Sequence, residues 1–162
     1  MHQVHTIPPV YDKDSRILIL GSFPSVRSRE VGFYYGHPQN RFWRILSELF
    51  EENLPVGTEA RKAFLLRHHI ALWDVIASCE ITGSSDSSIK NAVPNDLRAL
   101  LNATQISRIY TNGGTAHRLY IRHLYPMLGI SVTPLPSGSP ANAAWSLERL
   151  IEAWRVIRTD FS

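Results

Sequence analysis

The chain has 162 residues, of which 44% are hydrophobic and 19% are charged, so it holds enough apolar sequence for one compact domain spanning residues 1–162. The 17 Lys and Arg residues slightly outnumber the 14 Asp and Glu residues, and this small excess of positive charge permits a polyanionic partner without requiring one. With Cys79 as its only cysteine, the chain cannot form an internal disulfide, a cysteine-only zinc site or a four-cysteine iron–sulfur cluster.

Residues 1–9 contain no basic region followed by an apolar run, and no apolar segment reaches membrane-spanning length. Together with the lone cysteine, this predicts a soluble protein of a reducing compartment, the cytoplasm. Histidine could also bind a metal, but His2 and His5 are expected in an amino-terminal tail. The adjacent His68 and His69 would point apart on a strand or helix. We therefore expect no metal site.

Hydrophobic periodicity predicts four strands that alternate with helices along the chain. The predicted strands are residues 16–20, 70–75, 107–111 and 130–134. The predicted helices are residues 40–50, 58–68, 95–101, 115–124 and 142–157. Residues 78–92 are rich in Ser, Gly and Asp and have little periodicity, so we expect a long loop there. The alternation predicts an α/β fold, a three-layer αβα sandwich with a central four-stranded parallel sheet covered on both faces.

Functional sites of such sheets gather at the carboxyl ends of the strands. All four predicted strand ends carry polar, Gly or Pro residues, at 21–24, 73–74, 111–114 and 134–140. In the last of these, three prolines restrict the backbone, and the Ser and Gly residues leave N–H groups free to meet an anion. We expect this segment to press on a sugar-phosphate chain.

The segment 33–43 follows the first predicted strand and places aromatic rings, an amide and cationic side chains on a turn. It reads Phe-Tyr-Tyr-Gly-His-Pro-Gln-Asn-Arg-Phe-Trp. That combination suits the binding of a flat, uncharged ring attached to a phosphate backbone. The residues thus indicate a DNA base as the ligand.

Three stretches of the chain resemble a known family. They are Gly21-Ser22-Phe23-Pro24-Ser25, the segment 33–43, and Leu-Pro-Ser-Gly-Ser-Pro-Ala-Asn at 135–142. In this order they are similar to the signature motifs of the uracil-DNA glycosylase superfamily, and nearest to its hypoxanthine-DNA (deoxyinosine) glycosylase branch. The segment 33–43 also resembles the corresponding run of the mismatch-specific uracil/thymine glycosylases. The resemblance covers most of the chain, because the four-strand rhythm between the motifs fits as well.

The resemblance implies a mechanism, with one departure. Most superfamily members hold a catalytic Asp or Asn at the position of Phe23, and Phe can neither orient nor deprotonate water. The hypoxanthine branch also lacks that residue and relies on the Asn of a His-Pro-x-Asn segment, which here is Asn40. An amide can position and polarise water, and stabilising charge on the departing base and the sugar can outweigh deprotonation of water. From the residues alone, Asn40 could instead be the N-cap of the helix that follows it.

The family also implies roles for four base-binding residues. Tyr35 corresponds to the ring that stacks on the extruded base, or else it packs the loop as an ordinary aromatic. Asp74 ends the second strand, where superfamily members often read the base; it is a base reader or a general base, or it caps the loop through an Asx turn. Asn112 bonds the base edge or shapes the turn before Gly113. Phe23 completes the predicted base pocket.

The predicted contacts to the DNA backbone come from the same segments. They are Ser25, His37, Ser137, Gly138 and Ser139. For His37 the alternative is that the ring only braces its loop. Phosphates would lie beside Arg27, Arg29 and Arg41, because a guanidinium binds phosphate through two parallel hydrogen bonds.

We therefore predict a monofunctional DNA glycosylase that flips a deaminated base, hypoxanthine first, out of the duplex and hydrolyses its N-glycosidic bond in base excision repair. It would need no cofactor and would act as a monomer on DNA containing the deaminated base. A bifunctional reaction would need a lysine nucleophile, and none of the three lysines lies in a site motif. Two alternatives stay open: a preference for uracil or other pyrimidine lesions, and a catalytically silent nucleic-acid- or nucleotide-binding module.

Overall fold

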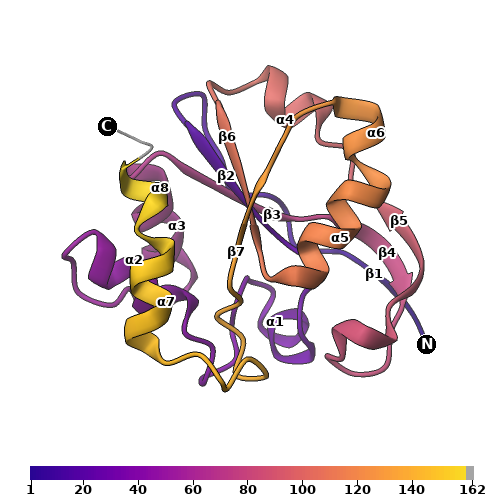
Figure 1. Ribbon diagram of the computed structural model, residues 1–162, viewed down its shortest axis with the longest axis horizontal. Coiled ribbons are helices and arrows are strands. Elements are labelled where there is room, and N and C mark those ends of the chain that lie inside the picture. Colours follow the sequence, from indigo (N-terminus) through magenta and orange to yellow (C-terminus); the bar gives the residue numbers. More distant parts are fainter. Residues whose placement is uncertain (160–162) are drawn as a thin grey trace.

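The computed structural model describes residues 1–159, and its centre is a four-stranded parallel sheet (Figure 1). The sheet consists of β2 (Ile17–Gly21), β3 (Ile70–Asp74), β6 (Arg108–Asn112) and β7 (Thr133–Leu135). The strands lie in the order β3-β2-β6-β7, and each neighbouring pair is parallel. All four predicted strands are found: the first three differ from the prediction by one residue at their ends, and the fourth shares only residues 133–134 with it.

Residues of β2 alternate between two hydrophobic clusters, one for each face of the sheet. Ile17 and Ile19 belong to one cluster, whereas Leu18 and Leu20 belong to the other. Every residue of β2 is buried, as expected for the central strand of a sheet that is covered on both faces. The apolar run that predicted this strand is therefore continuous because neither face meets water.

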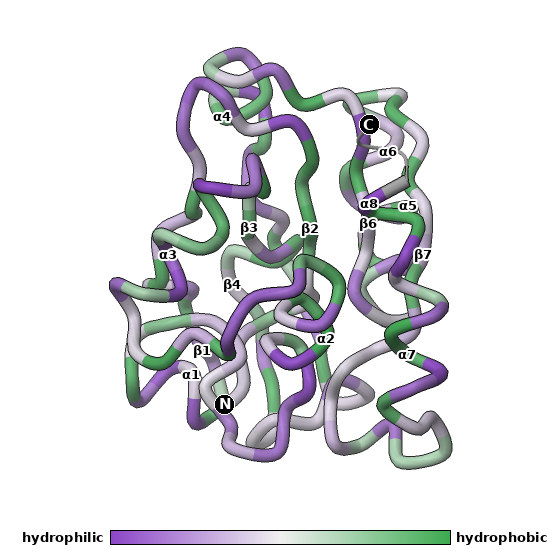
Figure 2. Tube along the Cα trace, turned by 90° about the vertical axis from the view of Figure 1, so that its left-hand side faces the viewer, coloured by the Kyte–Doolittle hydropathy of each residue, from purple (hydrophilic) through white to green (hydrophobic). Residues whose placement is uncertain are grey.

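Helices cover both faces of the sheet (Figure 1). On one side lie α2 (Phe42–Leu49), α3 (Thr58–Arg67), α7 (Leu147–Trp154) and α8 (Val156–Thr159). On the other side lie α4 (Arg98–Asn102), α5 (Gly114–His123) and α6 (Tyr125–Leu128). Figure 2 shows hydrophilic and hydrophobic residues alternating along α7, as expected for a helix that packs one face on the core. The predicted α/β fold is confirmed.

The helix predictions were incomplete in two places. The short helices α1 (Val26–Val31) and α6 were not predicted, because so few residues give no clear helical period. The predicted helix 142–157 is wrong at its start and is two helices: Ser146 Oγ accepts a hydrogen bond from the Arg149 N–H at 3.2 Å, and this cap starts α7. Within residues 1–159, no helix combines the length and hydropathy needed to cross a membrane.

A second, three-stranded antiparallel sheet occupies positions where a tail and a long loop were predicted. It consists of β1 (His2–Val4), β4 (Ile76–Glu80) and β5 (Lys90–Pro94), in the order β1-β4-β5, with the short 3-10 helix η1 (Asp86–Ser88) before β5. The predictions were wrong because the pairing of β4 with β5 shifts register on both sides of Ser78. Such bulges interrupt the period-two pattern by which a strand is recognised.

The order of the strands creates a topological switch between β2 and β6. The chain goes from β2 to its neighbour β3 on one side and later returns to β6 on the other side of β2. Ligands of open α/β sheets bind outside the carboxyl ends of the strands at such a switch. Here the two strand ends are Gly21 and Asn112.

Candidate active site

A cavity of about 310 Å³ opens at the carboxyl ends of β2, β3 and β6. Apart from Gly138 and the three arginines expected beside phosphates, every predicted site residue lines it. These residues are Phe23, Ser25, Tyr35, His37, Asn40, Asp74, Asn112, Ser137 and Ser139. Tyr34, Ser84 and Asp86 line it as well and were not predicted. Motifs that are far apart in the sequence thus form one concave site.

The floor of the cavity requires glycine at position 21. A Cβ atom on Gly21 would lie 2.4 Å from Asp74 Oδ1 and 2.8 Å from the Tyr35 hydroxyl oxygen. Both distances are far below van der Waals contact, so any side chain here would displace both groups. Because position 21 has no side chain, the Asp74 carboxylate and the Tyr35 hydroxyl can both lie over the end of β2.

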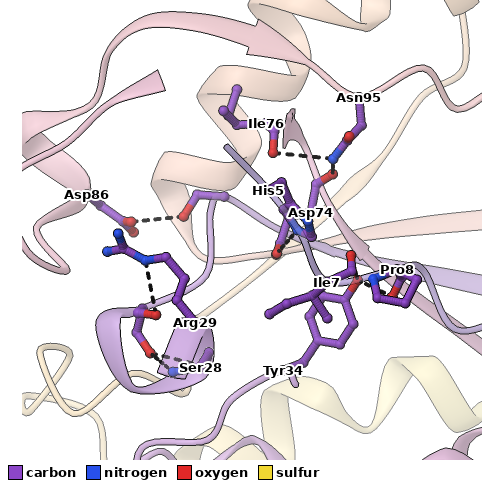
Figure 3. Close-up of polar contacts among 12 residues, drawn as sticks. His5, Ile7, Pro8, Ser28, Arg29, Tyr34, Asp74, Ile76, Asp86 and Asn95 are labelled. Atoms are coloured by element: carbon purple, nitrogen blue, oxygen red, sulfur yellow. Dashed lines mark hydrogen bonds and ion pairs between the residues drawn. The ribbon is translucent and has the colours of Figure 1, made fainter. Parts of the chain in front are cut away.

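The carboxylate of Asp74 is buried and paired with His5 (Figure 3). His5 Nε2 lies 2.8 Å from Asp74 Oδ2, and the two side chains are only 3% and 4% exposed. Asn95 holds the chain after β3 separately, since its Nδ2 donates to the carbonyl oxygens of Asp74 (2.8 Å) and Ile76 (3.3 Å). In the described part of the chain no backbone N–H donates to the Asp74 carboxylate, so the Asx turn considered from the sequence does not form. The prediction that His5 lies in a tail was wrong.

Tyr35 lines the cavity and packs on α2. Its ring centroid lies 4.2 Å from that of Phe42, with the planes tilted by 30°. The backbone φ of 53° is in the left-handed region, which an aromatic residue seldom adopts. Burial, reinforced by the negative charge of Asp74, raises the pKa of Tyr35 far above its ordinary value; the Asn112 side chain opposes this shift without reaching hydrogen-bond geometry. The buried hydroxyl stays protonated and has no hydrogen-bond partner among the described residues.

The Asn40 amide is held in place by the helix that follows it. Asn40 Oδ1 accepts a hydrogen bond from the Phe42 N–H at 2.9 Å and so satisfies one of the free donors at the start of α2. The capping alternative for Asn40 is therefore realised in part. The amide still lines the cavity, and the hydrogen bonds of the described residues leave its NH₂ group and one Oδ1 lone pair unused. An amide in one fixed orientation is what positioning a water molecule requires.

Asn112 joins the end of β6 to the loop after β7. Its Oδ1 accepts a hydrogen bond from the Gly138 N–H at 3.3 Å. Gly138 also packs on the start of α2, because its carbonyl oxygen accepts from the Arg41 N–H at 3.0 Å and a Cβ atom at 138 would lie 3.2 Å from Phe42 N. Asn112 thus has a structural role, which was one of the two alternatives predicted for it. Its side chain also lines the cavity.

The side chain of Arg41 braces the same loop, contrary to its expected place beside a phosphate. Its guanidinium donates to the carbonyl oxygens of Ser139 (3.1 Å), Asn142 (3.0 Å) and Trp145. A guanidinium with three backbone acceptors has little capacity left for a phosphate. Arg41 therefore sets the shape of the loop rather than reading the DNA backbone.

The other two arginines differ from each other. Arg29 donates to the carbonyl oxygens of Gly83 (2.6 Å) and Ser25 (3.4 Å), so it holds the segment before η1 against the start of α1. Arg27 is exposed, and within residues 1–159 its side chain has no hydrogen bond or ion pair. Of the three arginines, Arg27 has the guanidinium whose N–H donors are all available to a phosphate.

The Ser and Gly residues of 134–140 were expected to offer free N–H groups to an anion, and that expectation was wrong for Gly138 and Ser139; the next N–H, of Ala141, is bonded as well. The Ser139 N–H donates to Ser137 Oγ at 3.0 Å, the Ala141 N–H donates to Ser139 Oγ at 3.1 Å, and the Gly138 N–H donates to Asn112. The two serine hydroxyls accept in these contacts and keep their O–H hydrogens. Among the described residues, the Ser137 N–H and the serine hydroxyls are what this loop can still offer to an anion.

Ser25 and His37 also have structural partners. Ser25 Oγ accepts from the Ser28 N–H at 3.1 Å and donates to Ser28 Oγ at 3.1 Å, which makes Ser25 the N-cap of α1. His37 Nδ1 accepts from the Gln39 N–H at 3.0 Å, which is the bracing role considered for it. The His37 ring lines the cavity and its Nε2 is not used in that contact.

Asp86 is a site residue that the sequence did not reveal. It lies at the start of η1, where Ser22 Oγ donates to its Oδ1 at 2.9 Å. Asp86 is an exposed residue, yet the atoms packed around its carboxyl remove enough water to raise the pKa of that group, and the negative charge of Asp74 adds to the shift. The only signal in the sequence was the length and polarity of the segment 78–92.

Comparison with known proteins identifies the family. The model of the uracil DNA glycosylase superfamily matches residues 8–158. The chain belongs to this superfamily. A Methanosarcina acetivorans protein named hypoxanthine DNA glycosylase is 36% identical over 151 residues, which are 93% of this chain and 94% of that protein. A protein of the same name from Methanosarcina barkeri is 38% identical over 108 residues, 65% of this chain and 68% of that protein.

A solved structure of the uracil DNA glycosylase type is similar along the whole chain. It is a solution NMR structure from Methanosarcina acetivorans, described as a candidate uracil DNA glycosylase. It is 32% identical, has a TM-score of 0.79, and the match covers 98% of this chain and 99% of that one. Within the uracil DNA glycosylase superfamily, this chain is thus one whose first motif carries an apolar side chain, Phe23, on the wall of the cavity.

Proposed function

We propose that this protein is a monofunctional DNA glycosylase that removes hypoxanthine from DNA in base excision repair. The convergence of Tyr35, Asn40 and Asp74 on one cavity at the switch of the sheet carries the proposal. Membership of the superfamily and two relatives named hypoxanthine DNA glycosylase support it. That the chain is one domain, acts as a monomer and works in the cytoplasm stays a prediction.

The extruded base lies in the cavity against the ring of Tyr35. One face of that ring packs on Phe42, so the ring is held in place for a base to stack on. Stacking of this kind contributes ~1–3 kcal/mol per base. Phe23 makes part of the wall of the same cavity apolar, while Asp74 meets the polar edge of the base.

Bond cleavage depends on departure of the base, with Asn40 positioning the water. The Asn40 amide is oriented by the Phe42 N–H, and its free lone pair and NH₂ group can hold a water molecule near the anomeric carbon. Phe23 offers no base to deprotonate that water, so stabilisation of the developing charge on the leaving base and the sugar supplies the rate enhancement.

The described residues that line the cavity include no lysine, which supports the monofunctional assignment. A bifunctional glycosylase forms a Schiff base through an amine. We therefore expect base release to leave an intact abasic strand.

Single-turnover assays on matched duplexes test the function. Four duplexes carry hypoxanthine, uracil, xanthine or adenine at the same position and are otherwise identical. We expect fastest release of hypoxanthine, no release of adenine, and strand breakage only after hot alkali. Breakage without alkali would contradict the monofunctional assignment, and DNA binding without release of any base would favour the silent binding module.

Uracil removal is the second candidate. The similar NMR structure is described as a candidate uracil DNA glycosylase, and uracil presents the same adjacent N–H and carbonyl groups as hypoxanthine. Faster release of uracil than of hypoxanthine in the same assay would replace the first proposal by this one.

A further inference from the structure

The buried contact between His5 and Asp74 joins the amino-terminal segment to the floor of the cavity. The two residues lie 69 positions apart, their polar atoms are 2.8 Å apart, and both side chains are almost fully buried. Figure 3 shows the His5 ring next to Asp74. A buried ionisable pair is retained only where its geometry compensates the loss of water, so this contact needs a physical reason.

His5 is held rigidly from its backbone to its ring. The His5 N–H donates to the Ala77 carbonyl oxygen at 2.7 Å, directly after β1 has paired with β4. The ring makes edge contacts with Phe23 (centroids 5.9 Å apart) and Trp73 (6.4 Å). The packing of these two rings keeps the imidazole against Asp74.

The contact determines which carboxylate oxygen a ligand can use. His5 occupies Oδ2 of Asp74, whereas Oδ1 points over Gly21, the residue on the cavity floor. An ionised carboxylate only accepts hydrogen bonds. The pair thus presents an oriented acceptor at the bottom of the cavity, and no donor.

An oriented acceptor discriminates between hypoxanthine and adenine. Hypoxanthine carries a hydrogen on N1 next to its carbonyl group, so N1–H can donate to Asp74 Oδ1. In the same pose, adenine turns a lone pair on N1 toward Oδ1, and two acceptors that face each other form no hydrogen bond, which costs binding free energy. The repulsive arrangement excludes the undamaged base.

We propose that His5 is a positioning residue that fixes Asp74 as an acceptor and thereby makes the cavity selective for hypoxanthine over adenine. This inference rests on the proposed function, since it assigns the selectivity of that same cavity. It gives the amino-terminal strand a part in substrate choice. A purely structural His5 would pin the strand to the core and leave the selectivity unchanged.

Three variants separate these roles. His5→Phe keeps a ring against Phe23 and Trp73 but removes the hydrogen bond to Asp74. His5→Gln restores a donor at about the reach of Nε2. His2→Phe is the matched control, because it makes the same chemical change at an exposed position of β1.

Calorimetry below the melting temperature of each variant measures its affinity for free hypoxanthine and for free adenine. The selectivity ratio is the affinity for hypoxanthine divided by that for adenine. We expect His5→Phe to lower this ratio and the single-turnover rate on hypoxanthine DNA by roughly tenfold to a hundredfold, as loss of a partner that orients a reacting group does. We expect His5→Gln to recover most of both quantities and His2→Phe to leave both unchanged. An Asp74→Asn variant, which can turn an N–H donor to the base, should bind adenine better than wild type does.

The outcomes distinguish this inference from the proposed function. Equal affinity of the wild type for the two bases, or a wild-type ratio in His5→Phe, would overturn the role of His5 whatever the enzyme cleaves. A wild type that binds hypoxanthine selectively but releases no base from DNA would overturn the proposed function and leave the role of His5 supported.

Discussion

At Asn40, capping and catalysis use different parts of one amide, and substitutions can separate them. Asn40→Ala removes both: loss of the cap on α2 should lower the free energy of unfolding by about 1 kcal/mol. Base release should be abolished while binding to abasic DNA stays nearly intact, because a group that positions water acts mainly in the transition state. Single-turnover cleavage and abasic-DNA affinity measure the two effects.

Asn40→Asp is the matched control for the cap. The carboxylate can still accept from the Phe42 N–H, so the melting temperature should stay near that of the wild type. Its negative charge would oppose departure of an anionic base, and we expect slower release. Turnover near the wild-type rate in Asn40→Ala would remove Asn40 from the reaction.

For Tyr35, we expect the ring to contribute to base binding and the hydroxyl to contribute little. Tyr35→Phe deletes a buried hydroxyl that has no partner in the described residues, so activity should be mostly kept and the melting temperature equal or higher. Tyr35→Ala should lose ~1–3 kcal/mol of base capture. Melting temperature and single-turnover cleavage are measured together: a matched fall in both on every substrate would show that Tyr35 only packs its loop.

Asp86 should make stability depend on pH in an unusual direction. Its pKa in the folded protein is raised above the ordinary 3.8, so the folded state binds this proton more tightly than the unfolded chain does. The side chain therefore destabilises the fold progressively as pH rises above 3.8. Asp86→Asn, which still offers an acceptor to Ser22, should melt higher than wild type at neutral pH, by a small amount because Asp86 keeps solvent contact.

The difference between the two proteins should vanish in acid. The melting temperatures of wild type and Asp86→Asn are measured at several pH values. The series runs from about pH 3, roughly one unit below the ordinary carboxyl pKa, to about pH 8. A variant that is less stable than wild type at neutral pH would contradict the raised pKa.

At the scale of the elements, the conformation of the loop after β7 depends on the side chain of Arg41, which directly precedes α2. Arg41 donates to three of the loop's backbone carbonyl groups, so Arg41→Gln should leave partly buried acceptors without this donor and lower the free energy of unfolding by ~1–3 kcal/mol. We expect activity to fall on hypoxanthine and uracil DNA alike, because the loop lines the cavity regardless of the base. Chemical denaturation and the two cleavage rates test this; loss on one base alone would argue against a bracing role.

On the scale of the whole molecule, the affinity for DNA should fall steeply with salt. Each phosphate that the protein neutralises contributes a log–log slope of about −0.9. Arg27 is exposed, so Arg27→Ala should make the slope shallower by about one contact, whereas Arg41→Gln should leave it unchanged. Binding to an uncleaved duplex at several salt concentrations measures the slopes, and a flat response in the wild type would instead indicate a free nucleoside or nucleotide as substrate.

Local patterns were sufficient to predict the parallel sheet, and the resemblance to the glycosylase motifs predicted most of the cavity lining. β2 and β3 are short apolar runs, and such a run indicates burial on both faces. The strand ends carry the motif residues, and parallel strands bring their carboxyl ends to one edge of the sheet. Asp74 and Asn112 therefore line one cavity because of a topology that the order of strands and helices already implies.

The partners of the polar groups could be decided only by the tertiary structure. His5 looked like part of a tail because nothing near it in the sequence shows that Asp74 lies 2.8 Å away, and Arg41 looked like a phosphate ligand because its acceptors lie far along the chain. Periodicity records whether a position is buried, which is a property of each residue and its neighbours. A buried hydrogen bond depends on two groups at one point in space, so its partner appears only when the whole chain has folded.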